Sequence, residues 1–458
     1  MRTAPPDLPG SHTAESPLDR ALTLMLAGER DAALRWAAAV VQHDPSLPSS
    51  LILTSRLLAD AGRTEAAIEG FTLGLKRAID AGNLPLAIAA IGDLRALGVD
   101  VGEHLDGIAE AFCAGSPRLA DVATPPPPPL PHLDEFQTLS SFLTGPALLS
   151  KATEIIHDAS QEYESVAESE PPLITPLPLF SHLEKAGLRA LIECFEMVTV
   201  AAGKNVISEG EEGAEAYIVA RGELEVRREI HDPEGDETVT LARLTNGALF
   251  GEMALLSRAP RAASVVACRP SILLVARRDA LEAVAEKRPE VGVELAAHCR
   301  RRMVANLVRT SPVLLAVPPD ERAALVERFE TKVFEKGERL IADKEEPTGL
   351  HLIASGEVAV VGHEGDNGES FVIATLGVGD VVGEVALVLR RKASADVAAV
   401  HPTVTLHLPR EDFMALIRDH PAILAGLYLL AVARDEETKN VLTMSTTTVA
   451  EADEYVLV

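Results

Sequence analysis

The second half of the chain repeats itself, and this duplication constrains the fold more than any other feature. VARGELEV at 219–226 recurs as IASGEVAV at 353–360. Three single residues recur 134 positions later: Phe195, Gly203 and Glu223 correspond to Phe329, Gly337 and Glu357. Glu252 recurs as Glu384 after 132 positions, so the second copy has lost two residues in the hairpin around 231–236. The chain therefore holds two copies of one module.

Short β-branched runs separated by turn residues make up this module. In the first copy they are EMVTV, YIVARGELEVRR, ETVTLARL, ASVVA and SILLVAR. Helical patterns flank them: HLEKAGLRALIECF comes before, and DALEAVAEKRP and VGVELAAHCRRRMVANLVR come after. The spacing predicts a small antiparallel barrel or jelly roll with flanking helices. We expect the two modules at 175–310 and 311–440.

The N-terminal region 17–115 reads as helices broken at glycines. The turn AGERDAA at 27–33 recurs as AGRTEAA at 61–67, a spacing of 34 residues. This spacing resembles tetratricopeptide repeats, in which stacked helix pairs bury a continuous core. A third turn, AGNLPLA at 81–87, follows after only 20 residues and breaks the period, so an unrelated bundle of helical hairpins is the alternative.

The remaining segments read as connections. Residues 1–16 are predicted to be disordered, and 441–458 to form a C-terminal tail. Residues 116–174 are predicted to be a Pro-rich linker, in which TPPPPPLPH is a semi-rigid spacer and EFQTLSSFL and LLSKATEIIHDASQEY are possible helices. The predicted fold class is a multidomain α+β chain: a tetratricopeptide-like helical domain followed by two β-roll or jelly-roll modules.

Composition limits the partners. Aromatic residues make up 3% of the chain and apolar residues 47%, so we expect cores of Ala, Val and Leu. The net charge of −27 opposes binding to nucleic acid and to anionic membranes. The four cysteines show no metal-ligand spacing, and no export signal or membrane-spanning run is evident, which predicts reduced, buried thiols in a cytoplasmic protein without metal. The Ala/Arg/Leu-rich usage hints at a bacterial source.

One loop contains the candidate ligand-binding residues. FGEMALLSRAPRAASV at 250–265 places a single Glu and two Arg among small residues, which leave backbone amides uncovered, and Arg is a fork for phosphate. The loop resembles, without a gap, the phosphate-binding cassette of cyclic nucleotide-binding domains. VISEGEEGAEAYIVARGELEV at 206–226 also resembles the Gly-turn and Gly-Glu hairpin of that family. The resemblance covers roughly 175–458.

The resemblance implies roles for the cassette. Arg261 would bind the exocyclic phosphate, Glu252 would accept the ribose 2′-hydroxyl, and Arg261 would help to hold that carboxylate. Ala at 262, rather than Thr, favours cAMP over cGMP. The ligand-binding residues expected are Gly251, Glu252, Met253, Ala254, Arg261, Ala262 and Ala263. The alternative is an internal Glu252–Arg261 salt bridge in a barrel that binds nothing.

The second copy is predicted to be degenerate. DVVGEVALVLRRKASADVAAV at 380–400 keeps Gly383, Glu384, Ala386 and Leu387. Ten positions after its glycine stands Ala393, where the first copy has Arg261; sliding the alignment would bring Lys392 there but lose the match of Val397 to Val265. We therefore expect weak or no ligand binding. RRKAS at 390–394 also resembles a site for a kinase that recognises basic residues, although replacement of the lost charge is the preferred interpretation.

A helix at about 290–309 is expected to act as a lid over the base, as in the family. Its candidate residues for covering the base are Met303, Leu307 and Arg301. The alternative for Arg300, Arg301 and Arg302 is that they form a solvated face of the helix. The helix leads into the next predicted helix, 311–329, so its movement would change the angle between the modules.

Taken together, these patterns predict a cyclic nucleotide sensor, with cAMP the preferred ligand, whose helical region binds a partner protein. The tandem order resembles regulatory subunits of protein kinase A, although no RRxS or RRxA pseudosubstrate precedes Thr175. The alternatives are a scaffold that binds no ligand and a transcription regulator, which would need a helix-turn-helix in place of the acidic tail. No P-loop, nucleophile elbow, HExxH or kinase signature indicates an enzyme or a cofactor.

Overall fold

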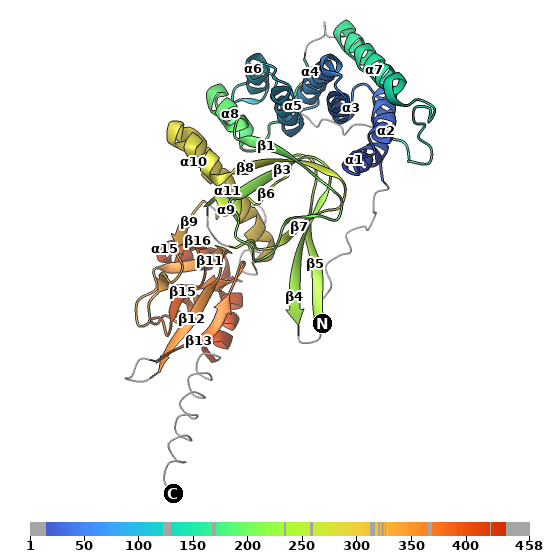
Figure 1. Ribbon diagram of the computed structural model, residues 1–458. Coiled ribbons are helices and arrows are strands. Elements are labelled where there is room, and N and C mark those ends of the chain that lie inside the picture. The colour runs from blue at the N-terminus through green and yellow to red at the C-terminus, as the bar shows by residue number, and fades with distance from the viewer. Residues whose placement is uncertain are drawn as a thin grey trace. The chain divides into compact units, whose positions relative to one another are not determined.

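The computed structural model describes residues 15–121, 130–166, 171–232, 235–256, 260–311, 317–318, 321, 325, 327–364, 369–421 and 423–436 (Figure 1). The predicted disordered N-terminus, most of the Pro-rich spacer and the C-terminal tail lie outside these residues, as does most of the predicted helix 311–329.

Six helices follow one another in the N-terminal region, each packed on its neighbour in sequence. They are α1 (Pro17–Leu26), α2 (Arg30–His43), α3 (Pro48–Asp60), α4 (Thr64–Asp80), α5 (Leu84–Ala96) and α6 (Gly102–Phe112). The first begins where Ser16 and Asp19 form a capping box ahead of Pro17. The repeated turns join α1 to α2 and α3 to α4, and Gly28 and Gly62 take positive φ there. The region is helical as predicted, and its tetratricopeptide nature stays a prediction.

The segment after the predicted spacer belongs to the same helical layer. Helix α7 (Gly145–Val166) includes the predicted stretch LLSKATEIIHDASQEY and packs against α2, α3 and α4. The other predicted helix, EFQTLSSFL, is wrong, because residues 135–143 form turns and irregular backbone. There the Phe136 ring stacks on Trp36 at 6.0 Å between centroids and fastens the segment to α2.

The first β module is a sandwich of two four-stranded antiparallel sheets, with strand orders β1-β8-β3-β6 and β2-β7-β4-β5. Its strands are β1 (Phe195–Val200), β2 (Asn205–Ile207), β3 (Glu215–Arg221), β4 (Leu224–Asp232), β5 (Gly235–Leu244), β6 (Leu249–Phe250), β7 (Ser264–Ala267) and β8 (Ser271–Arg277). Its core includes Val219, Leu224, Val265 and Leu273, so aliphatic residues fill it as the composition predicts.

The second module repeats this topology strand for strand, with orders β9-β16-β11-β14 and β10-β15-β12-β13. Its strands are β9 (Glu330–Phe334), β10 (Arg339–Ile341), β11 (Gly349–Ser355), β12 (Val358–Glu364), β13 (Glu369–Leu376), β14 (Val381–Val382), β15 (Asp396–Ala399) and β16 (Thr403–Pro409). The sequence duplication is therefore a duplication of the fold.

Helices flank both modules. Around the first lie η1 (Phe180–His182), α8 (Lys185–Ile192), α9 (Met253–Leu256), α10 (Arg278–Lys287) and α11 (Pro289–Thr310). Around the second lie α14 (Glu384–Val388), α15 (Arg410–Asp419) and the helix Ile423–Glu436. In the part of the chain that the structure describes, no single helix has the length and apolar composition to cross a membrane, and one bent pair, α15 with Ile423–Glu436, meets the test only when its two helices are joined.

Contacts divide the chain into two compact units. The first comprises Met1–Ser208, Glu215–Phe250 and Ala263–Leu295, and the second comprises Glu209–Ala214, Gly251–Ala262 and Ala296–Val458. The helical region and the first sandwich thus share a unit, in which α5 packs on β1, β3 and β8. The cassette of the first module belongs with the second half of α11.

Candidate functional site

The first cassette begins where β6 ends. Phe250 is buried and stacks on Tyr217 with ring centroids 5.2 Å apart, which fixes the end of the strand. Gly251 then takes φ 73°, a left-handed conformation that favours glycine, and the short helix α9 follows. Met253 and Ala254 lie on that helix, and Met253 packs on the core of the second unit. The turn is therefore anchored by apolar side chains at Phe250 and Met253.

Arg261 is held at both ends. Its backbone N–H donates to the carbonyl oxygen of Glu211, and its own carbonyl accepts from the N–H of Gly210, both at 2.9 Å. Its guanidinium Nη1 donates to the carbonyl oxygen of Gly251 at 2.9 Å. A Cβ on Gly213 would lie 2.4 Å from the Nε of Arg261, so glycine at 213 lets the guanidinium keep this position without a shift. Sequence reasoning did not single out Gly213, although its place in the EEGAE turn offered a signal.

Glu252 pairs with a different arginine from the one expected. Its carboxylate, 4% exposed, accepts a hydrogen bond at 2.8 Å from Nε of Arg302 on α11. The expectation that Arg261 holds this carboxylate is wrong, because Arg261 turns to the Gly251 carbonyl. Cys299 lies one helical turn before Arg302 with its Sγ 3.8 Å from the carbonyl oxygen of Glu252, and burial raises its pKa to about 12. The Cys299 thiol is therefore uncharged and packs beside the Glu252–Arg302 pair.

The arginine triplet of α11 is only partly a solvated face. Arg300 donates to the carbonyl oxygen of Phe329 and Arg302 to Glu252, whereas Arg301 is exposed. Met303 and Leu307 are each 1% exposed and lie in the hydrophobic core of the second unit. The expectation that either residue caps a base is wrong here, because that core already encloses both side chains.

Two predicted residues follow Arg261. Ala262 is exposed, and Ala263 is half-buried immediately before β7. Of the seven predicted residues, Gly251, Glu252, Met253 and Arg261 are thus tied together by backbone, ion-pair and core contacts, while nothing is described of the Ala254 side chain.

The second cassette has the same start. β14 is followed by Gly383, with φ 90°, and by α14, where Ala386 and Leu387 are buried. Glu384 is 2% exposed on its side chain and accepts at 2.6 Å from Nη1 of Arg434 in helix Ile423–Glu436. Burial raises the pKa of Glu384 even though Arg434 opposes that shift.

The two ion pairs share one sequence spacing. Arg302 follows Glu252 by 50 residues, and Arg434 follows Glu384 by 50 residues. Each module thus uses the helix after its sandwich to neutralise its cassette carboxylate. Sequence reasoning missed both arginines, and the constant spacing within the duplication was the signal for them.

Backbone hydrogen bonds fix the register of the second cassette. Ala393 donates to the carbonyl oxygen of Glu345 and accepts from the N–H of Lys344, both at 2.9 Å, as Arg261 does with Glu211 and Gly210. Ala393 therefore occupies the place of Arg261. In the same loop Pro347 stands where the first copy has Gly213, and Lys344 keeps a left-handed φ of 63° where the first copy has Gly210.

A cavity of about 120 Å³ lies in the second module beside this cassette. Apolar side chains line most of it, among them Ile341, Val360, Ile373, Leu376 and Val382. Its charged lining side chains are Glu384 and Arg434, which neutralise each other. At the place that corresponds to Arg261, the cavity lining has Ala393, which cannot bind a phosphate through its side chain.

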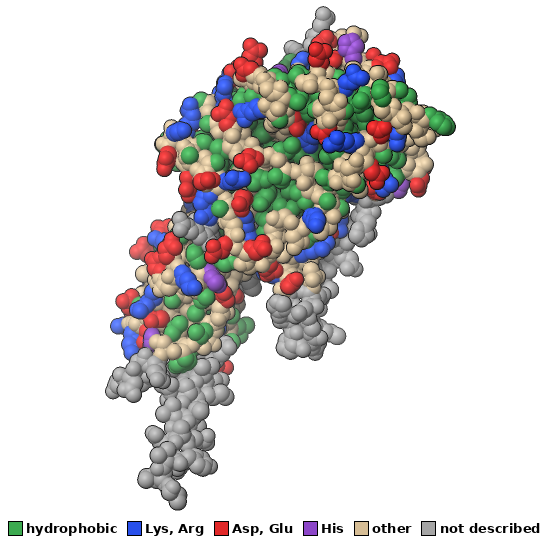
Figure 2. All heavy atoms as spheres, in the orientation of Figure 1, with side chains coloured by type: hydrophobic (Ala, Val, Ile, Leu, Met, Phe, Trp, Pro, Cys, Tyr) green, Lys and Arg blue, Asp and Glu red, His purple; other side chains and the backbone are tan. Residues whose placement is uncertain are grey.

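The described residues also bear on metal binding, on the cysteines and on the surface charge. Within them, no group of three or more His, Cys, Asp or Glu side chains is placed to hold a metal ion. The four cysteines are free thiols, but only Cys299 is buried and the other three are half-buried. On the face shown in Figure 2, Lys and Arg side chains are interspersed with Asp and Glu.

Comparisons with known proteins relate both β modules to one family model. Residues 197–288 and 331–420 match the family model of the cyclic nucleotide-binding domain. The cAMP-dependent protein kinase regulatory subunit of Yarrowia lipolytica is 30% identical over 239 residues, which are 52% of this chain and 58% of that protein. The chain thus spans little more than half the length of this relative.

Solved structures give likenesses with low TM-scores. The regulatory domain of Toxoplasma gondii protein kinase A, crystallised with cAMP, is 24% identical with a TM-score of 0.27, over 56% of this chain and 92% of that one. A cyclic nucleotide-binding domain from Methylobacillus flagellatus is 25% identical with a TM-score of 0.27, over 29% of this chain and 73% of that one. Besides its helical N-terminal region, the chain thus has two stretches in tandem that match the cyclic nucleotide-binding domain, and it is similar over about half of its length to a protein kinase A regulatory subunit.

Proposed function

We propose that the chain is a cAMP-responsive regulatory protein in which the first cyclic nucleotide-binding domain takes the ligand and the helical N-terminal region passes the response to a partner protein. The observation that carries the proposal is the setting of Arg261. Its backbone is fixed on both sides, and its guanidinium lies against Gly213 and donates to the carbonyl oxygen of the half-buried Gly251. A fixed guanidinium next to backbone amides suits a monoanionic phosphate.

Glu252 completes the proposed clamp. A carboxylate accepts hydrogen bonds from hydroxyl groups, and the free 2′-hydroxyl of the cyclic nucleotide's ribose is the group that it would recognise. Its pairing with Arg302 holds the buried carboxylate in one orientation. Because Arg302 lies on α11, ligand contact with Glu252 would bear directly on that helix.

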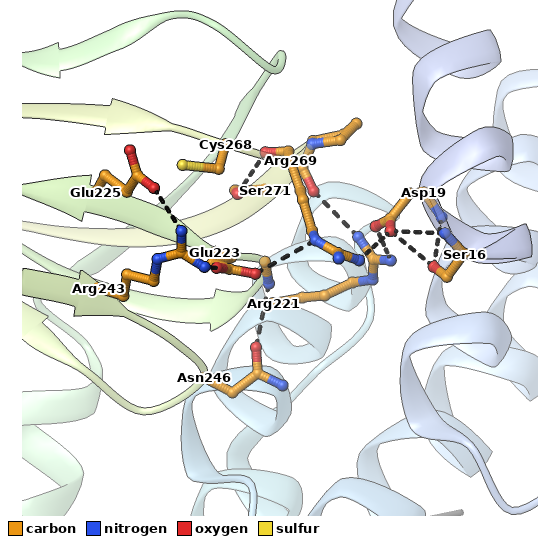
Figure 3. A network of polar contacts seen from close by, with 12 residues as sticks. Ser16, Asp19, Arg221, Glu223, Glu225, Arg243, Asn246, Cys268, Arg269 and Ser271 are labelled. Carbon is orange, nitrogen blue, oxygen red and sulfur yellow. Dashed lines mark hydrogen bonds and ion pairs between the residues drawn. The ribbon is translucent and has the colours of Figure 1, made fainter. Parts of the chain in front are cut away.

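Contacts inside the first unit support the part played by the helical region. Asp19 of α1, 3% exposed, accepts from Arg221 at 2.5 Å and from Arg269 at 2.9 Å, and both arginines belong to the first sandwich (Figure 3). Burial alone would raise the pKa of Asp19, but the charge of Arg221 and the bonds from Ser16 and Arg221 hold it below its usual value. The helical region is thus fastened to the sandwich by a buried ion cluster.

The cluster continues to the turn before β6, the strand that precedes the cassette. Arg269 also contacts Glu223 at 3.4 Å, and the Gly222 N–H between Arg221 and Glu223 donates to the Asn246 side chain at 3.1 Å (Figure 3). Asn246 lies three residues before β6, which runs into Gly251. Inside the first unit, this chain of contacts runs from the helical region to the turn before β6, and coupling between two sites requires a connection of this kind.

Thermal unfolding with cAMP and with cGMP tests the proposal. A ligand at about 100 times its Kd adds roughly 2.7 kcal/mol to the free energy of unfolding. We expect cAMP to raise Tm more than cGMP, and Arg261→Ala to abolish both increases. Equal melting of the wild type with and without either nucleotide would instead favour a scaffold that binds no ligand.

A further inference from the structure

Ser394 lies in a motif that the proposed ligand site does not use. Arg391 and Lys392 stand three and two positions before it, and no other adjacent pair of basic residues in the chain is followed at this spacing by Ser or Thr. The corresponding residue of the first cassette is Ala262, 132 positions earlier. The cassette fold therefore does not require a hydroxyl at this position.

The Ser394 hydroxyl is available to an external enzyme. Ser394 and Lys392 are both exposed in the loop between α14 and β15. No hydrogen bond involves the Ser394 side chain within the described residues. The two backbone bonds of Ala393 hold the loop just before it.

One ion pair ties this loop to the last described helix, and a second ties α14, just before the loop, to the same helix. Arg391 donates to Asp435, which is 9% exposed, and the neighbouring Arg434 donates to Glu384 at 2.6 Å. Ser394 and Arg434 both line the 120 Å³ cavity. A charge added at Ser394 would therefore act on the arginines that fasten helix Ile423–Glu436.

We propose that Ser394 is the acceptor of a serine protein kinase that recognises basic residues before its target, and that the phosphate loosens helix Ile423–Glu436. In the reaction the Ser394 Oγ forms a bond to the γ-phosphorus of ATP as the bond from that phosphorus to ADP breaks. The hydroxyl proton passes to the catalytic base of the kinase, and ADP leaves.

The local charge balance gives the direction of the effect. Three carboxylates, Asp380, Glu384 and Asp435, already share Arg391 and Arg434. A phosphoserine adds close to two negative charges and competes for the same guanidinium groups. The helix that depends on these pairs is thereby released rather than tightened.

The direct test uses the full chain, ATP and the catalytic subunit of cAMP-dependent protein kinase as the probe, with the acceptor located by mass spectrometry. We expect phosphate on Ser394 in the folded protein and none there in Ser394→Ala. Lys392→Ala, which removes an exposed side chain, should slow the reaction at least tenfold without a change in Tm. Ser370→Ala, an exposed serine without preceding basic residues, should react like the wild type.

Two outcomes would overturn the proposal. One is phosphate on Ser394 only after the chain has been unfolded, or not at all. The other concerns the consequence: amide hydrogen exchange in 423–436 should be severalfold faster in the phosphorylated protein than in the unphosphorylated one, and equal exchange would exclude release of the helix.

Discussion

The two cassettes differ in what they keep of the same structure. Both have a left-handed glycine, a buried glutamate and an arginine 50 residues later that neutralises it. Only the first has Arg261 with Gly213 beneath it, and the second has Ala393 and Pro347 instead. The carboxylate–arginine pair is thus common to both copies, whereas the phosphate-binding part is confined to one, so structure and ligand recognition can be tested separately.

The largest expected effect is on ligand affinity. Arg261→Ala should weaken cAMP binding by about 30-fold to several thousandfold, since loss of a desolvated charge pair costs about 2–5 kcal/mol. The matched control is Arg277→Ala, an exposed arginine of the first sandwich, which should bind like the wild type. Equilibrium titration measures both, and equal weakening in the two variants would remove the special role of Arg261.

The shared ion pairs should matter for stability in both copies. Arg434→Ala should lower the free energy of unfolding by about 3 kcal/mol and Arg302→Ala by about 1–2 kcal/mol, because each leaves a buried carboxylate without its partner. The difference follows from exposure, which is 20% for the Arg434 side chain and 34% for that of Arg302. Denaturant unfolding gives both values, and the reverse order would contradict this account of the pairs.

Gly213→Ala should weaken cAMP binding about tenfold. The new Cβ would meet the guanidinium of Arg261, and overpacking strain is about 1–3 kcal/mol. Gly92→Ala in α5, where a Cβ meets nothing within 4 Å, should not change affinity. If Gly213→Ala also binds cAMP normally, the position of the Arg261 guanidinium against Gly213 is not required for binding.

The smallest effect concerns the cluster around Asp19. The folded pKa of Asp19 is lowered, so its contribution is present above its unfolded value of 3.8 and is lost as the pH falls through the folded value. Asp19→Asn should cost about 1–2 kcal/mol at neutral pH and flatten the fall of Tm in acid. Melting curves from pH 7 to 3 check this, and parallel curves for the two proteins would show that Asp19 does not contribute through its charge.

Local pattern predicted the parts of the fold that repeat or alternate. The duplicated strands, the cassette turn at Gly251 and the Ala393 position could be read from spacing alone, because they depend on neighbours in the sequence. The ion pairs of Arg302 with Glu252 and of Arg434 with Glu384 could not be predicted in this way. In each pair the two residues are 50 positions apart, and only the folded chain brings them into contact. Asp19 and Arg221 are 202 positions apart, and no pattern in the neighbouring sequence of either residue indicates that they form an ion pair.

The central claim is that one of the two duplicated cassettes binds a cyclic nucleotide. Calorimetric titration of the full chain with cAMP tests it most directly through stoichiometry. We predict one site per chain in the wild type and none at the same concentrations in Arg261→Ala. Two equivalent sites, or one site that survives Arg261→Ala, would contradict the account.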